Sequence, residues 1–102
     1  MAQANRATVS GRLIELDTLR HTPAGVPVLK FRLQHESSQT EAGGARKVSC
    51  ELAAVAFERE AKLLAAAKLG SKVTVTGFLA AKSRSSRALV LHAVEIQFEE
   101  GD

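Results

Sequence analysis

The sequence is poor in several residue types, and each shortage excludes a class of structure. The single cysteine, Cys50, excludes a disulfide within the chain and a cysteine metal cluster, and its place in an apolar run predicts a buried side chain. No apolar run approaches the roughly 18 residues that span a bilayer. Residues 1–6 also lack the apolar core of a secretory signal. We therefore expect a cytoplasmic protein with no membrane contact.

Residue clusters that perform catalysis are also lacking. The histidines His21, His35 and His92 follow no spacing that is typical of a metal site, and we expect His35 and His92 to be structural. Glu58 and Glu60 lie where a helix is expected to begin, so they are interpreted as helix-terminal charges rather than as an acid–base pair. The pattern therefore predicts no catalytic residue, no metal, no cofactor and no small-molecule substrate.

Aromatic side chains are few, because tryptophan and tyrosine do not occur and phenylalanine occurs four times. Phe31 alternates with Leu29 and Leu33, which predicts a place in the core. Phe98 is expected to serve packing rather than stacking. Phe78 lies opposite an apolar face and has two open interpretations, an exposed stacking platform or a contact in a dimer.

Acidic residues are missing from a long stretch, residues 61–94. That stretch holds six basic residues: Lys62, Lys68, Lys72, Lys82, Arg84 and Arg87. Uncompensated like charges destabilise a fold, so a basic segment often has an anionic partner, and the net charge of +3 permits nucleic acid. Lys82, Arg84 and Arg87 lie among three serines between two apolar runs. They predict a hairpin tip that contacts phosphates, and the alternative is a solvated loop.

Hydrophobic periodicity predicts an all-β chain with one helix. The period changes at Phe57 and stays helical to Lys68, and Gly70 follows as a stop signal. Residues 37–45 are polar and contain two glycines, which predicts a mobile loop. The predicted strands are residues 7–16, 28–37, 46–54, 72–81 and 88–98.

A helix between the third and fourth of five strands is the order of the OB-fold, a five-stranded Greek-key barrel. We expect residues 1–102 to form one such domain. In this fold, oligonucleotides bind the face of strands two and three and the loops that join strands one to two and four to five. The basic residues that map to these places are Lys30, Arg32, Lys47 and Arg20, together with Lys82, Arg84 and Arg87. Lys30, Arg32 and Lys47 have the alternative of solvating an exposed sheet face.

Five motifs carry a resemblance that spans about residues 5–102. They are Thr-Pro-Ala-Gly-Val-Pro-Val at 22–28, Phe-x-Leu-x-His-Glu-Ser at 31–37, Gln-x-Glu-Ala-Gly at 39–43, Gly-Ser-Lys-Val-Thr-Val-Thr-Gly-Phe at 70–78, and Leu-His-Ala with a following Ile at 91–96. In this order they resemble the primosomal replication protein N (PriB) family, which is related to the single-stranded DNA-binding proteins. The resemblance implies a cytosolic bacterial homodimer with one OB-fold per subunit. It further implies binding of single-stranded DNA and the PriA helicase during replication restart, in some bacteria with DnaT.

The chain departs from that family at positions that matter for binding. Members of the family place aromatic residues near positions that correspond here to Gly44 and Ser49. We therefore expect weaker DNA binding that depends on phosphate contacts and responds steeply to salt. The ending at residues 99–102 argues against a general single-stranded DNA-binding protein with its long acidic tail. Two other functions stay open: a module that mainly docks the helicase, and an RNA-binding OB module of translation.

Overall fold

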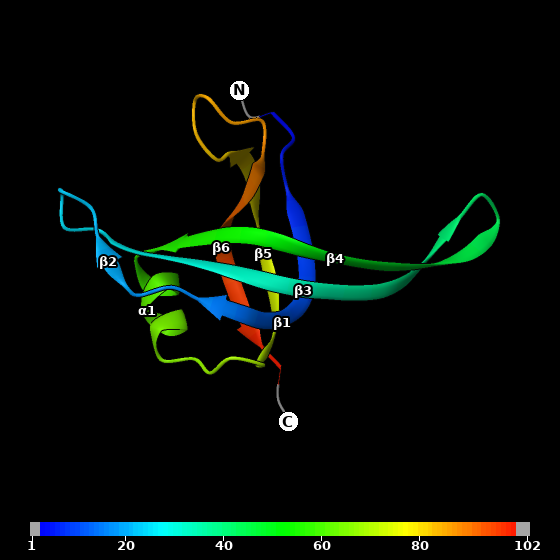
Figure 1. Ribbon diagram of the computed structural model, residues 1–102, viewed down its shortest axis with the longest axis horizontal. Coiled ribbons are helices and arrows are strands. Elements are labelled where there is room, and N and C mark those ends of the chain that lie inside the picture. Colours follow the sequence, from blue (N-terminus) through cyan, green and yellow to red (C-terminus); the bar gives the residue numbers. More distant parts are fainter. Residues whose placement is uncertain (1–2, 100–102) are drawn as a thin grey trace.

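The computed structural model describes residues 3–99. Within this range the elements are β1 Ala7–Leu16, β2 Arg20–His21, β3 Pro27–Glu41, β4 Gly44–Phe57, α1 Arg59–Ala65, β5 Lys72–Ala81 and β6 Leu89–Phe98. The strands form one sheet in the order β1-β5-β6-β4-β3-β2, and a further pairing of β1 with β3 closes it into a barrel. In Figure 1 the long β3–β4 hairpin crosses the β5–β6 hairpin and extends well beyond it.

This architecture confirms the predicted OB-fold, in which five long strands close a barrel and one short helix joins two of them. The two-residue strand β2 is additional and lies beside the expected turn, where it pairs with the start of β3. For that reason α1 follows the fourth numbered strand, although it still follows the third long one. No helix in the described part of the chain is long and apolar enough to cross a membrane.

The helix is shorter than the predicted 57–68. Phe57 stays extended because it still pairs with β3, and Glu58, with a φ of 59°, turns the chain into α1. The predicted stop residue, Gly70, does have a left-handed φ of 87°, but it lies beyond the end of the helix. Its N–H donates to the carbonyl oxygen of Leu13 at 2.7 Å, so Gly70 directs the connection back onto β1.

The mobile loop predicted for residues 37–45 is wrong. The antiparallel pairing of β3 with β4 continues without a break to Glu41 opposite Gly44. The turn between them consists of Ala42 and Gly43, whose φ angles of 53° and 82° are typical of a tight hairpin turn. Polar side chains suit this hairpin because it has left the barrel and both of its faces meet solvent. We call its projecting part, residues 36–49, the arm.

The core is enclosed by the inward side chains of the barrel strands and by two residues of α1. Phe31 is only 3% exposed, which confirms its predicted place in the core. The buried cluster consists of Leu13, Leu29, Phe31, Leu33, Ala54, Ala56, Ala61, Leu64, Val73, Val75, Leu91 and Ile96.

Cys50 is exposed, so the predicted burial of its side chain is wrong. The alternation of β4 does place Cys50 on the same face as Leu52, which packs against the core. Cys50, however, pairs with His35 at the base of the arm. This pair lies two residues along the ladder from the Leu33–Leu52 pair at the end of the barrel. An apolar run in the sequence therefore continues past the point where the barrel can bury it.

Candidate nucleic-acid interface

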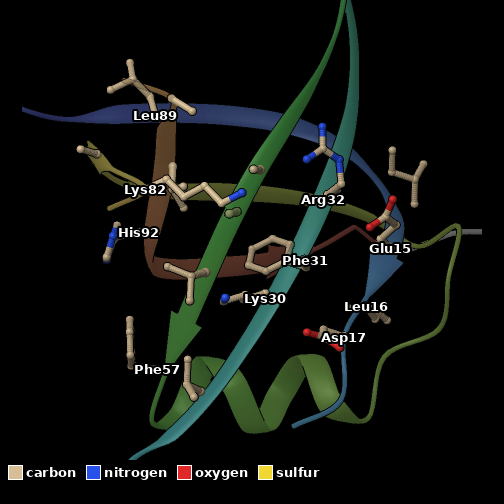
Figure 2. A pocket seen from close by; sticks show the side chains of 18 of the residues that line it. Glu15, Leu16, Asp17, Lys30, Phe31, Arg32, Phe57, Lys82, Leu89 and His92 are labelled. Atoms are coloured by element: carbon tan, nitrogen blue, oxygen red, sulfur yellow. The ribbon is translucent and has the colours of Figure 1, made fainter. Parts of the chain in front are cut away.

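A groove of about 840 Å³ crosses β3 and β4 between the end of β1 and the β5–β6 hairpin. Three of the predicted cationic residues, Lys30, Arg32 and Lys82, line it. Figure 2 shows Lys30 and Arg32 on β3, and Lys82 reaching over the groove from the β5–β6 hairpin. The structure therefore brings together cations that are about 50 residues apart in the sequence.

The position of two of these cations follows from the period of β3. Leu29, Phe31 and Leu33 point inward and are buried, so the alternate residues Lys30 and Arg32 point to the outer face. Lys30 is exposed and Arg32 is half-buried. The cations thus sit on a sheet surface whose inner side is fixed by the core.

The β5–β6 loop holds the other predicted cations. The backbone N–H of Lys82 donates to the carbonyl oxygen of Ala88 at 2.9 Å, which prolongs the hairpin beyond its last strand pair. The Ser86 hydroxyl accepts the N–H of Ala88 at 3.1 Å, so this serine holds the loop in shape. Arg84 and Arg87 are exposed at the tip and lie outside the residues that line the groove.

Acidic side chains also occur in the groove. Glu15 and Asp17, at the end of β1, line it beside the cations of β3, because Glu15 pairs with Arg32 and the Asp17 N–H donates to the carbonyl oxygen of Lys30 at 2.9 Å. Arg32 is paired with Glu51 at 3.4 Å, and both side chains are more than a third exposed, so this contact is weak and open to competition by phosphate. Among residues 3–99, neither lysine of the groove takes part in an ion pair. The lining thus carries three cationic and two acidic side chains, and Lys30 and Lys82 are the cations that are available to an anionic ligand.

Two further predicted residues lie apart from this groove. Arg20 pairs with Val28 in the β2–β3 ladder and so shares the outer face of β3, beyond the groove lining. Lys47 pairs with Ser38 on the arm, six positions from Arg32, which is about 20 Å along the strand. A ligand that touches every predicted cation would have to run from the loop tip, through the groove and out along the arm.

The sequence reasoning missed a stack of three rings beside the groove. The His92 ring lies parallel to those of Phe78 and Phe57, with centroid distances of 4.9 Å and 6.1 Å and interplanar angles of 16° and 19°. Of its members, Phe57 and His92 line the groove. Because the three residues are on different strands, only the strand register could have revealed them: His92 pairs with Phe78 in β5.

Comparison with known proteins identifies the relatives of this fold. A family model that is described as "another single-strand binding protein family" matches residues 5–95. Replication restart protein PriB of Bordetella pertussis is 43% identical over 88 residues, which cover 86% of this chain and 82% of the relative. PriB of Yersinia pestis is 33% identical over the whole of both chains. This chain belongs to the PriB family.

Solved structures agree with this membership. The PriB structure of Ralstonia solanacearum superimposes with a TM-score of 0.87 at 31% identity, covering 96% of this chain and all of that one. The single-stranded DNA-binding protein of Thermus aquaticus gives a TM-score of 0.77 at 22% identity and covers 51% of that chain, which shows a shared fold.

The described residues hold no group of three or more histidine, cysteine or acidic side chains that could bind a metal ion. Every buried side-chain nitrogen or oxygen among them has a hydrogen-bond partner. The groove, with its lysines and rings, is therefore the feature that a function has to explain.

Proposed function

We propose that this chain binds single-stranded DNA as an accessory protein in replication restart, and that it acts by binding rather than by catalysis. The observation that carries the proposal is the placement of Lys30 and Lys82, from two different hairpins, in one groove of an OB-fold. The relatives support the biological setting, because those reported above are named replication restart proteins.

The groove would hold the phosphate backbone through its lysine ammonium groups. Each ammonium is a compact charge that needs no fixed angle of approach, which suits an irregular single strand. Arg84 and Arg87 would extend the contact at the loop tip, and Arg20 would extend it at the other end of the groove. Lys47 would add a contact on the arm. Arg32 would join by exchanging its weak contact with Glu51 for a phosphate.

The partners are part of the same proposal. We propose that the chain is cytoplasmic, forms a homodimer, and binds the PriA helicase, with DnaT as a further partner where one exists. One feature supports the homodimer: β1 pairs with β3 only from Arg12 onward, so residues 7–9 have no ladder partner on that side. An open strand edge is a natural place for a second chain to pair. A monomeric mass in solution at micromolar concentration would contradict the homodimer.

A titration with a labelled oligothymidylate at several salt concentrations tests DNA binding. Each phosphate neutralised on a single strand adds about 0.7 to the steepness of the log–log salt plot. We expect the double variant Lys30→Ala, Lys82→Ala to bind at least about tenfold more weakly at low salt, with a slope shallower by about 1.4. The matched control is Lys62→Ala, an exposed lysine on α1 outside the groove, which should change neither quantity. Absence of binding at low salt, or a flat salt response of the unmodified chain, would sink the proposal.

A second candidate function is a docking module for the helicase with weak DNA contact. It is favoured by the acidic side chains in the groove, Glu15 and Asp17, which reduce its attraction for phosphate. A pull-down with PriA helicase separates the two functions. If the triple variant Lys82→Ala, Arg84→Ala, Arg87→Ala loses DNA affinity but keeps helicase binding and restart stimulation, docking is the main activity. Equal or stronger affinity for RNA than for DNA would instead indicate an RNA-binding module.

A further inference from the structure

The stack of Phe57, His92 and Phe78 lies on the side of the sheet that faces away from the core. His92 on β6 pairs with Phe78 on β5, and its other neighbour in the ladder is Val55 on β4. Phe57 lies two residues after Val55 on β4, so the three rings stand side by side across three strands. We call these three residues the ring stack.

The ring stack is open to solvent although it is made of large flat groups. Phe57 is 37% exposed and Phe78 is 41% exposed. The core lies on the opposite face and is complete without them, since the buried cluster includes neither phenylalanine. Exposure of two phenylalanine rings held parallel to a third ring is unusual for a packing role, and it is what a stacking surface requires.

The position of the ring stack relative to the cations points to its ligand. Phe57 and His92 line the same groove as Lys30 and Lys82. Figure 2 shows Phe57 and His92 along one side of this groove, with Lys30 toward its middle and Lys82 higher in the view. A strand whose phosphates meet these lysines would therefore turn its bases toward the rings.

We infer that the ring stack is the base-stacking surface of the groove, an inference that rests on the proposed binding of single-stranded DNA. Phe57 would stack on a base in the groove through the ring face that is turned away from His92. His92, which lies between the two phenylalanines, would hold the plane of Phe57, and Phe78 would hold the plane of the His92 ring from the outer side. The arm, residues 36–49, contains no aromatic residue and offers no competing surface. Stacking on a ring face accepts every base, so this surface would bind without sequence preference.

A single-tryptophan reporter tests the inference directly, because the chain has no tryptophan of its own. In Phe57→Trp, stacking of a base should quench the indole fluorescence as oligothymidylate is added, and the quenching should saturate with the binding curve. The matched control is Phe98→Trp, which replaces a phenylalanine that is 40% exposed at the end of β6 and outside the groove. Its fluorescence should not change on DNA addition.

A second measurement removes the bases instead of the ring. The unmodified chain should bind an abasic oligonucleotide about 5- to 150-fold more weakly than oligothymidylate of the same charge. Phe57→Ala should lose most of this difference while its salt slope stays that of the unmodified chain, because no phosphate contact is lost. Phe57→Leu separates the loss of a flat ring from the loss of apolar volume. Thermal melting of Phe57→Ala and Phe57→Leu checks that the barrel is intact.

The outcomes distinguish this inference from the function on which it rests. If the chain binds DNA with a steep salt response, but Phe57→Trp is not quenched and abasic DNA binds equally well, the stacking surface is refuted and the proposed function stands. If no DNA binds at low salt, both fail. If Phe78→Ala halves the mass in solution and leaves the preference for bases unchanged, Phe78 is a subunit contact and its assigned role is refuted.

Discussion

Gly77 offers a sharp test of the fold, because its substitution by alanine acts on the β5–β6 pairing that positions the ring stack. A β-carbon at Gly77 would overlap the carbonyl oxygen of His92 and lie 2.8 Å from its carbonyl carbon and 3.2 Å from the Cα of Ala93. All of these atoms belong to the backbone, so no side chain can move aside. The register of β5 against β6 also shifts between Thr76 and Gly77, which brings the two backbones together at this point.

The magnitude follows from a comparison of three glycines. At Gly11 a β-carbon would lie 2.7 Å from the carbonyl oxygen of Gln34, so a smaller displacement relieves the contact. At Gly44 the nearest atom is the Glu41 carbonyl oxygen at 3.9 Å, which is an ordinary contact. Overpacking costs about 1–3 kcal/mol, and more where the backbone must separate. We expect Gly77→Ala to lower the free energy of unfolding by more than about 3 kcal/mol, Gly11→Ala by about 1–3, and Gly44→Ala by less than about 0.5.

Urea denaturation followed by circular dichroism measures these differences, and Gly44→Ala is the matched control for the added methyl group. Because β6 would have to move away from β5, Gly77→Ala should also weaken DNA binding by any fraction that remains folded. The reasoning is refuted if Gly77→Ala is as stable as Gly44→Ala, or if Gly11→Ala is more damaging than Gly77→Ala. Either result would mean that the backbones of β5 and β6 are not in contact at Gly77.

Two further predictions concern burial. Leu64→Ala should lower the free energy of unfolding, measured by urea denaturation, by about 2–5 kcal/mol, because this fully buried side chain fixes α1 to the barrel. The control Ala65→Ser, at an exposed position on α1, should change the free energy of unfolding by less than about 0.5 kcal/mol. Cys50 should react with one equivalent of a thiol reagent in the folded protein without denaturant, because it is exposed at the base of the arm; reaction only after unfolding would contradict its placement.

Periodicity in the sequence predicts the barrel because its strands are half-buried. The alternation of Leu29, Phe31 and Leu33 with Lys30 and Arg32 specifies both the strand and its outward face, and the structure confirms both. The cations of β3 were predictable for the same reason: one face of the strand is committed to the core. The order of strands and helix then indicates which loops meet.

The arm and the ring stack lie beyond this kind of prediction. A polar segment with two glycines is typical of a loop, and only the positive φ angles of Ala42 and Gly43 show that it turns tightly enough to extend both strands. The burial predicted for Cys50 was wrong for a related reason: the sequence does not show where along β4 the barrel ends and the exposed arm begins. The ring stack depends on the register of β4, β5 and β6, and a one-residue slip would turn one of its members to the opposite face.

The groove depends on the contact between the two hairpins as much as on its charges. Lys30 belongs to the β3–β4 hairpin and Lys82 to the β5–β6 hairpin, and the hairpins join through a short parallel ladder from Ala54 to Ala56 on β4. His92 lies within that ladder, opposite Val55, so the joint between the hairpins also carries the central ring of the ring stack. The spacing between Lys30, Lys82 and the ring stack is therefore fixed by the barrel itself, and with it the spacing between the proposed phosphate contacts and the proposed stacking surface. For this reason a change in the ladder should alter DNA affinity even when every cation is retained.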